Sequence, residues 1–219
     1  MIVCYHRSSS LGTLEFCEQK YFLQYNLSLK DKQNKKALMG TVTHKVMQTL
    51  GDKKVAMKKG LDIVEDEETG KTLTFEQCDD LKLLNDIAFD YYSNAFPELD
   101  MTDADRRKCL SWAEKAGAYQ DGVFDPRNQN VHSTELFFDF EIDEPWAKYE
   151  YLVGGEVIEG NLSIKGTVDL IIDNGNNYYE ILDYKTGKRI NWATGEEKTY
   201  EKLQKDTQLL LYYYALKNT

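Results

Sequence analysis

The chain has 219 residues, of which 42% are hydrophobic and 29% are charged, with only 3 prolines. This composition is typical of a soluble globular protein with one large domain. No stretch approaches the roughly 18 consecutive apolar residues of a membrane span. The start, Met1 to Arg7, lacks the charged and apolar regions of a signal peptide. We therefore expect a cytoplasmic protein with no membrane partner.

The charge balance restricts how the chain could bind nucleic acid. With 37 acidic and 27 basic residues, its formal net charge is -10. A polyanion must therefore meet a local basic patch or a bound cation. The four cysteines, Cys4, Cys17, Cys78 and Cys109, form no C-x-x-C pair. This argues against a compact zinc site and against a secreted disulfide framework.

Helical patterning dominates the first part of the chain. Three serines at positions 8–10 can cap a first helix that reaches about Tyr25. A second helix, of about residues 37–50, carries apolar residues at helical spacing on one face. These residues are Leu38, Val42, Val46 and Leu50. We expect that stripe to be the buried side.

The middle of the chain shows no motif that suggests a chemistry. Residues 51–70 are charged and turn-like. Beyond them, Thr74 and Thr102 are expected to cap two amphipathic helices. We interpret residues 52–130 as a helical insertion or lid within a single domain of residues 1–219.

Strand patterning begins near Val131, where apolar and polar residues alternate as far as Ile142. A second alternation, from Leu162 to Ile172, leads into the tetrad at 174–177, which is a strong turn signal. Residues 178–185 then form a third predicted strand. The second and third strands should form a hairpin.

The register of this hairpin can be predicted. A three-residue loop would pair Asn174 with Tyr178, and the same register places Asp169 opposite Asp183. Directly opposite Cβ atoms lie about 4.5–5.5 Å apart, so the two carboxylates could share one divalent cation. Lys185 points to the same face. Alternatively, the two acids bond to turn amides or to lysines.

Two such carboxylates beside an ammonium suit a particular chemistry. Hard oxygen ligands bind Mg²⁺ or Mn²⁺. Cleavage of a phosphodiester needs a cation that acidifies water and a positive side chain that holds the nucleophile or the developing charge. The hairpin therefore predicts a metal-dependent phosphodiesterase site.

Several short motifs occur in a fixed order along the chain. They are Ser8 to Ser10 with Cys17 to Tyr21, Gly40 to His44, Gly166 to Asp169, Asp183 to Lys188, and Gln208 with Tyr212. In this set and order the chain resembles a RecB-family member of the PD-(D/E)XK nuclease superfamily. The resemblance implies an α/β fold with a restriction-endonuclease-like core, in which helices flank a central mixed sheet, and with a helical insertion.

The resemblance also implies a set of site residues. His44, Asp169 and Asp183 would bind the catalytic metal, Mg²⁺ or Mn²⁺, and the main-chain carbonyl of Tyr184 would complete the set. Lys185 would assist the attacking water.

Helical geometry supports the place of His44. At about 100° per residue, it lies nearly opposite the apolar stripe of its helix. Ala37, Gly40 and Gly51 lie beside it, and these small residues allow close approach by another chain segment or a substrate. The alternative is a structural or merely exposed histidine.

The last helix is expected to begin at a cap on Thr194 and to reach about Lys217. Its predicted apolar stripe contains Leu203, Thr207, Leu210 and Tyr214. Gln208 and Tyr212 stand off this stripe. By the resemblance they shape the site or contact the DNA backbone, and the alternative is a solvated helix face.

Lys188 and Lys20 could contact phosphates, although charged residues often only face solvent. Glu135 is a further candidate site carboxylate. Some relatives hold an iron–sulfur cluster with a cysteine at the place of Cys17 and three more beyond the final helix. Because no cysteine follows Cys109, we expect no cluster.

These features predict a Mg²⁺- or Mn²⁺-dependent deoxyribonuclease, which by the resemblance is an exonuclease acting on single-stranded DNA or duplex ends in DNA repair or recombination. Two alternatives stay open: a catalytically inactive nuclease-fold module that binds DNA or a protein, and the nuclease part of a larger machine. No ATP-binding Gly-x-x-x-x-Gly-Lys-Ser/Thr loop is present, so a helicase or recombination partner would have to supply unwinding. A serine nucleophile near His6 is disfavoured, since a helix cap explains the serines better.

Overall fold

The computed structural model describes residues 5–29, 32–187, 197 and 199–217. The chain divides into two compact units. Unit 1 comprises Met1–Lys32, Phe137–Thr167 and Lys188–Thr219, and unit 2 comprises Gln33–Leu136 and Val168–Gly187. The single domain expected from the sequence stays a prediction. Within the described part, no helix has both the length and the apolar character needed to cross a membrane.

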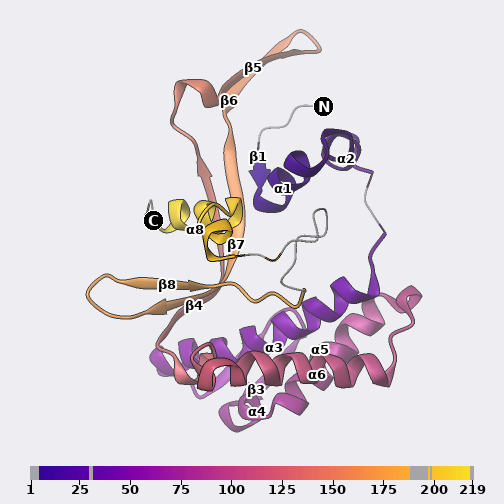
Figure 1. Ribbon diagram of the computed structural model, residues 1–219, viewed down its shortest axis with the longest axis vertical. Coiled ribbons are helices and arrows are strands. Elements are labelled where there is room, and N and C mark those ends of the chain that lie inside the picture. Colours follow the sequence, from indigo (N-terminus) through magenta and orange to yellow (C-terminus); the bar gives the residue numbers. More distant parts are fainter. Residues whose placement is uncertain (1–4, 30–31, 188–196, 198, 218–219) are drawn as a thin grey trace. The chain divides into compact units, whose positions relative to one another are not determined.

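Strand β7 (Ser163–Asp173) organises a four-stranded sheet. It runs parallel to β1 (Tyr5–Arg7) and antiparallel to β8 (Tyr179–Leu182). Its other neighbour is β4 (Val131–Glu141) (Figure 1). The sheet is therefore mixed, and the predicted α/β fold is confirmed.

The β7–β8 hairpin has the predicted register. Leu170 pairs with Leu182, and the backbone N–H of Asn174 donates to the carbonyl of Tyr178 at 2.9 Å. The loop residues 175–177, one glycine and two asparagines, all have positive φ. These residue types adopt that conformation most readily, so the turn chemistry fixes which side chains face each other.

Helix α3 (Lys35–Lys58) is the long helix of unit 2. It begins after Asn34, whose side chain accepts a hydrogen bond from the backbone N–H of Ala37 at 2.8 Å. The predicted buried stripe is confirmed, because each of its four residues is at most 1% exposed. The helix continues past its predicted end near residue 50, so the turn-like interpretation of the following segment is wrong as far as Lys58.

Gly51 lies inside α3 because a side chain would not fit there. A Cβ built on it would lie 2.5 Å from Cγ2 of Thr134 and 2.9 Å from Cδ1 of Leu170. A glycine before a charged run is typical of a helix end, but here the glycine lets α3 pack closely against β4 and β7.

The segment predicted as a helical insertion also contains a hairpin. Its elements are β2 (Ile63–Asp66), β3 (Lys71–Thr74), α4 (Phe75–Asp79), α5 (Leu81–Ala95) and α6 (Asp103–Ala118). As predicted, Thr74 and Thr102 cap helices, each in a capping box with the residue three positions on. The one helix expected from Thr74 to near Phe96 is, however, divided into α4 and α5, and α5 has its own cap, Asp80. The sequence does not predict β2 and β3, since these four-residue strands carry several charged side chains.

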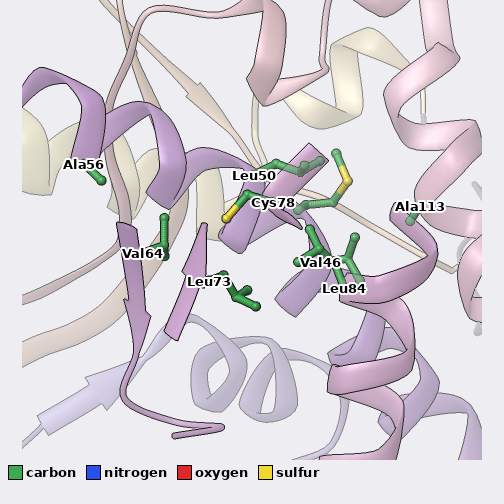
Figure 2. Close-up of a cluster of buried hydrophobic side chains, with 9 residues drawn as sticks. Val46, Leu50, Ala56, Val64, Leu73, Cys78, Leu84 and Ala113 are labelled. Carbon is green, nitrogen blue, oxygen red and sulfur yellow. The ribbon is translucent and has the colours of Figure 1, made fainter. Parts of the chain in front are cut away.

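This middle segment shares a hydrophobic core with α3. Figure 2 shows that core. The labelled side chains are Val46, Leu50, Ala56, Val64, Leu73, Cys78, Leu84 and Ala113. Burial of apolar surface is the main stabilising contribution to folding, so the segment belongs to the core of unit 2 and is not a detachable lid.

Unit 1 departs from the sequence prediction in several places. The first helix is divided at Cys17, an extended residue with φ of -163°, into α1 (Ser8–Phe16) and α2 (Glu18–Tyr21). A separate antiparallel hairpin, β5 (Lys148–Val153) and β6 (Glu156–Asn161), is not predicted.

The last helix is divided as well, into α7 (Tyr200–Leu203) and α8 (Thr207–Lys217). The predicted cap, Thr194, lies outside the described residues. The predicted apolar stripe is wrong: Leu210 is 53% exposed, whereas Tyr212 is 3% exposed. The break between α7 and α8 resets the helical phase, so residues on either side of it do not share one face.

Candidate metal centre

Two acids face each other where the hairpin of unit 2 begins and ends. Asp169 lies on β7, and Asp183 directly follows β8. Because Leu170 pairs with Leu182, the next pair outward is Asp169 with Asp183, and opposed residues share a face. Burial raises the pKa of Asp183, and the charge of Asp169 adds to the rise. The structure therefore brings the two predicted carboxylates together.

His44 extends from α3 to Asp169. Its Nδ1 lies 3.3 Å from Oδ2 of Asp169, and the same oxygen accepts a hydrogen bond from the backbone N–H of Tyr184 at 2.8 Å. The close approach predicted beside His44 is also present, because a Cβ built on Gly40 would lie 2.9 Å from Oγ1 of Thr186. The Asp169 carboxylate is thus held between helix and hairpin.

Glu135 joins this pair in a cluster. One ligand atom each from His44, Glu135 and Asp169 lies within 4.8 Å of the other two. Glu135 has φ of 44° although it belongs to β4. A non-glycine residue in this region costs about 1–3 kcal/mol, and such distortions concentrate at functional sites. Burial and the charge of Asp169 raise the pKa of Glu135 to about 7.

The sequence indicated Glu135 only as a further candidate. Its signal was an acid on the polar side of a strand, which many surface strands share. The left-handed backbone at this residue depends on tertiary packing and leaves no mark in the sequence.

Lys185 forms an ion pair with Asp183. Among the described residues, it forms no ion pair with another carboxylate. Its Nζ lies 2.6 Å from Oδ2 of Asp183 and 2.8 Å from Oδ1. The Asp183 side chain is 10% exposed and that of Lys185 is 58% exposed. The ammonium is therefore fixed by a nearly buried carboxylate and still open to solvent or to a bound molecule.

Tyr184 lies between these residues, and its side chain points away from the acids. Its hydroxyl donates to the carbonyl of Phe124 at 2.8 Å, and its ring meets that of His44 edge-on at 6.4 Å. The role predicted for its own carbonyl does not involve the hydroxyl.

Replacing Tyr184 by phenylalanine should therefore lower the stability of the protein without a large effect on its rate of cleavage. The variant loses one buried hydrogen bond, so its free energy of unfolding should fall by about 0.5–1.5 kcal/mol. The rate of the metal-dependent DNA cleavage that the sequence predicts should stay within a few-fold of the parental rate. Thermal denaturation and a cleavage assay check both parts, and a large loss of rate without a loss of stability would contradict the prediction.

A cleft of about 610 Å³ opens beside the cluster. Its lining residues are Ala37, Gly40, Thr41, His44, Lys45, Gln48, Glu68, Tyr92, Glu135, Asp169 and Thr186. All of them belong to unit 2. The potential metal ligands are therefore accessible from a hollow large enough for part of a nucleotide strand.

The donor set suits a divalent cation. Imidazole nitrogen and carboxylate oxygens are ligands of Mn²⁺, and carboxylates are the usual protein ligands of Mg²⁺. Burial, with a smaller contribution from the charge of Asp169, raises the pKa values of Glu135 and Asp183, and a bound cation would favour their charged forms. His44, Glu135 and Asp169, with Asp183 beside them, could hold such an ion.

The predicted substrate-binding residues belong to unit 1. Tyr212 packs edge-on against Phe138 at 6.1 Å, and its hydroxyl accepts a hydrogen bond from Gln208 at 2.5 Å. Lys20 is exposed on α2, and Lys188 lies outside the described residues. Contacts of these four residues with DNA stay predictions.

The residue at the N-cap of α1 is Arg7, and of the predicted cap serines it is Ser10, in the first turn, whose side chain bonds to the backbone there. Ser10 is 3% exposed, and its hydroxyl accepts from the backbone N–H of Arg7 and donates to the carbonyl of Arg7, both at 2.9 Å. His6 lies 3.4 Å away, and no carboxylate is described as its partner. A hydroxyl committed to the backbone in this way is not an activated nucleophile.

Comparison with known proteins agrees with this geometry. A sequence model of the PD-(D/E)XK nuclease superfamily matches residues 8–219, which include every residue of the cluster and the cleft. No curated protein and no solved structure matches the chain. The chain therefore belongs to the PD-(D/E)XK nuclease superfamily.

Proposed function

We propose that this protein is a Mg²⁺- or Mn²⁺-dependent deoxyribonuclease that hydrolyses phosphodiester bonds. The observation that carries the proposal is the cluster of His44, Glu135 and Asp169 beside the Asp183–Lys185 pair. Membership of a nuclease superfamily supports it. A set of opposed acids with an adjacent ammonium is costly in a pure scaffold, so the cluster favours catalysis over binding alone.

The residues of the cluster divide the chemical tasks. His44, Glu135, Asp169 and Asp183 hold the metal, and the carbonyl of Tyr184 is the further ligand that we propose. When bound, the metal polarises the phosphoryl oxygen and lowers the pKa of a water molecule.

Lys185 is proposed to hold that water in line with the bond that breaks. Its Nζ is anchored by Asp183 and its side chain remains 58% exposed, so one N–H can donate to a water or to a phosphoryl oxygen. The water oxygen forms the new bond to phosphorus while the bond to the leaving oxygen breaks. The ammonium stabilises the negative charge that develops.

Exonuclease action on single strands or duplex ends is the finer part of this proposal. It rests on the likeness of the sequence motifs to those of RecB-family nucleases, as do a role in DNA repair or recombination and a helicase partner. A cleft of about 610 Å³ accommodates a strand end more readily than a whole duplex.

The test is incubation of end-labelled DNA with the full chain in Mg²⁺, in Mn²⁺ or in chelator. Linear single strands, linear duplexes and closed circular DNA should be compared in parallel. We expect cleavage only with metal, and only of DNA that has free ends. Cutting of the circular substrate would overturn the exonuclease assignment, and cutting in chelator would overturn the metal mechanism.

An inactive nuclease-fold module is the competing function, and the net charge of -10 is the observation that favours it. It predicts retention of DNA or a protein partner without cleavage under any metal condition. The same assay, with binding measured beside cleavage, decides between the two.

A further inference from the structure

Lys45 is a nearly buried cation next to the proposed metal ligands. It follows His44 on α3, and its side chain is 5% exposed. Its Nζ lies 2.6 Å from Oδ1 of Asp66 and 3.2 Å from Oε2 of Glu68. Asp66 ends strand β2, and Glu68 follows it in the loop before β3. The middle segment of the chain therefore supplies both of its acidic partners.

The cleft offers few positive charges to a phosphate. Among the described residues that line it, Lys45 alone carries a fixed positive charge. Thr41 and Gln48, which lie four residues before and three residues after Lys45 on α3, line the same cleft. Nζ of Lys45 also donates to Oε1 of Gln48 at 3.3 Å, and the hydroxyl of Thr41 donates to the carbonyl of Ala37 at 3.3 Å. One face of α3 therefore presents a cation beside two polar side chains, of which Gln48 keeps its amide N–H groups for a ligand.

The two acids are not equivalent partners. The Asp66 side chain is 8% exposed, and its other oxygen accepts from the hydroxyl of Thr69 at 2.7 Å. The Glu68 side chain is 44% exposed, its contact with Lys45 is the longer one, and it lines the cleft. Asp66 is therefore a fixed part of unit 2, whereas Glu68 can leave Lys45 for solvent.

This inference rests on the nuclease function proposed above. We propose that Lys45 binds a phosphate group of the DNA strand, and that the Glu68 carboxylate occupies the position of this phosphate until DNA enters. A phosphate oxygen would replace one Glu68 oxygen at Nζ while Asp66 keeps its contact. The exchange substitutes one anion for another, so it leaves no buried charge unpaired.

Tyr92 sets the position of Glu68 in the empty cleft. Its hydroxyl donates to Oε1 of Glu68 at 2.6 Å, while Oε2 contacts Lys45. Glu68 therefore holds a negative charge inside the cleft, where it also acts on Glu135. That charge repels DNA until Glu68 turns outward, which makes the contact self-inhibitory.

The decisive variant is Glu68→Gln, because it predicts a gain that structural damage cannot produce. It keeps Lys45, Asp66 and Tyr92 in place and removes the competing charge. Binding of a fluorescently labelled single-stranded oligonucleotide should be measured by anisotropy in Mg²⁺. All chains should carry Lys185→Ala, so that the strand is cut slowly while the metal ligands are intact. Glu68→Gln should bind about 3- to 10-fold more tightly at low salt, and this gain should shrink as salt screens the removed charge.

A second variant tests Lys45 itself. Lys45→Met should be combined with Asp66→Asn, so that no buried carboxylate loses its cation. Binding should weaken, and the slope of log affinity against log salt should flatten by about 0.7, as expected for one lost contact between a lysine and a single strand. Lys45→Arg, which keeps the positive charge, should instead have the affinity and the salt slope of the parent.

Matched controls come from the same helix. Lys53 also belongs to α3 and pairs with a single acid, Asp79, at 2.6 Å, but it does not line the cleft. Lys53→Met and Asp79→Asn should leave affinity unchanged. The inference is overturned if Asp79→Asn tightens binding as much as Glu68→Gln does, or if Glu68→Gln binds no more tightly than the parent.

The same experiment distinguishes failure of this inference from failure of the proposed function. If the chain with Lys185 intact cuts DNA with metal and the Glu68 and Lys45 variants bind with unchanged affinity, the inference alone is wrong. If that chain neither binds nor cuts DNA, the proposed function is wrong and the inference is wrong with it.

Discussion

Replacing Asp183 or Lys185 by alanine is expected to slow metal-dependent cleavage of DNA by at least about 100-fold, the scale of losing one group that stabilises the transition state. The two side chains form one unit, with Nζ of Lys185 in contact with both oxygens of Asp183. Removal of Asp183 therefore also releases the ammonium of Lys185. Cleavage of labelled DNA under single-turnover conditions measures the effect.

The two variants should differ in metal binding although their rates fall alike. Asp183→Ala removes a proposed ligand and should weaken Mn²⁺ binding in calorimetry. Lys185→Ala removes a cation and should leave binding equal or tighter. A rate loss in Lys185→Ala that came with lost Mn²⁺ binding would show damage to the site and not to catalysis.

Control variants can be taken from the same elements. Glu180 is an acid of the same hairpin whose carboxylate contacts the amide of Asn174 at 3.3 Å, near the turn. Lys82 is an exposed lysine paired with Asp86 at 2.7 Å, and it does not line the cleft beside the metal cluster. Alanine at Glu180 or Lys82 should leave cleavage unchanged. Parental rates in Asp183→Ala and Lys185→Ala would remove the basis of the nuclease mechanism.

The predictable part of this site follows local chemistry. The turn after β7 has residues that favour positive φ, so its length and the register of the hairpin could be inferred, and with them the pairing of Asp169 with Asp183. The face of His44 followed from helical periodicity, because the apolar stripe opposite it is continuous.

The unpredicted part depends on contacts between segments far apart in sequence. Glu135 joins the cluster from a strand in which its own backbone is left-handed. Lys45 is an ordinary charged residue in a helical pattern until the β2–β3 hairpin, which the sequence does not reveal, places Asp66 and Glu68 against it. Neither arrangement has a local sequence signal.

The break in the last helix is the other feature that the sequence did not predict. The stripe predicted on the last helix assumed one continuous phase from Leu203 to Tyr214, yet α8 starts anew after Asp206, whose Oδ1 accepts from the backbone N–H of Gln208 at 3.0 Å. An aspartate can serve equally well as a helix cap or as a surface residue within a helix. Tyr212 was therefore placed on the wrong side.

Glu135→Gln is expected to make the metal-free protein more stable at pH 8 and the metal-bound protein less stable. Burial and Asp169 raise the pKa of Glu135 from 4.5 to about 7, so the folded state binds this proton more tightly than the unfolded state. The stability that this proton contributes is fully present below pH 4.5 and is lost as pH rises through about 7. Glutamine is neutral throughout and loses nothing.

Because Glu135 is only partly buried, the pH effect should be modest. Between pH 5 and pH 8 in chelator, the free energy of unfolding of the parent should fall relative to the variant by about 1 kcal/mol after allowance for solvent screening. Thermal or urea denaturation at both pH values measures it. Glu141, an exposed acid on the same strand, provides the matched Glu→Gln control.

In metal, the parent should become more stable than Glu135→Gln. This reversal would connect the strained backbone of residue 135 to metal binding. An ion at 100 times its dissociation constant stabilises the folded state by about 2.7 kcal/mol. The parent should gain this in Mg²⁺ or Mn²⁺, whereas Glu135→Gln, which lacks one carboxylate ligand, should gain less. An equal metal-induced shift in both proteins would show that Glu135 is not a ligand. The distorted backbone of residue 135 would then need another explanation. A reversal would mean that the fold tolerates the partly buried carboxylate of Glu135 because the bound cation restores the stability that its burial costs.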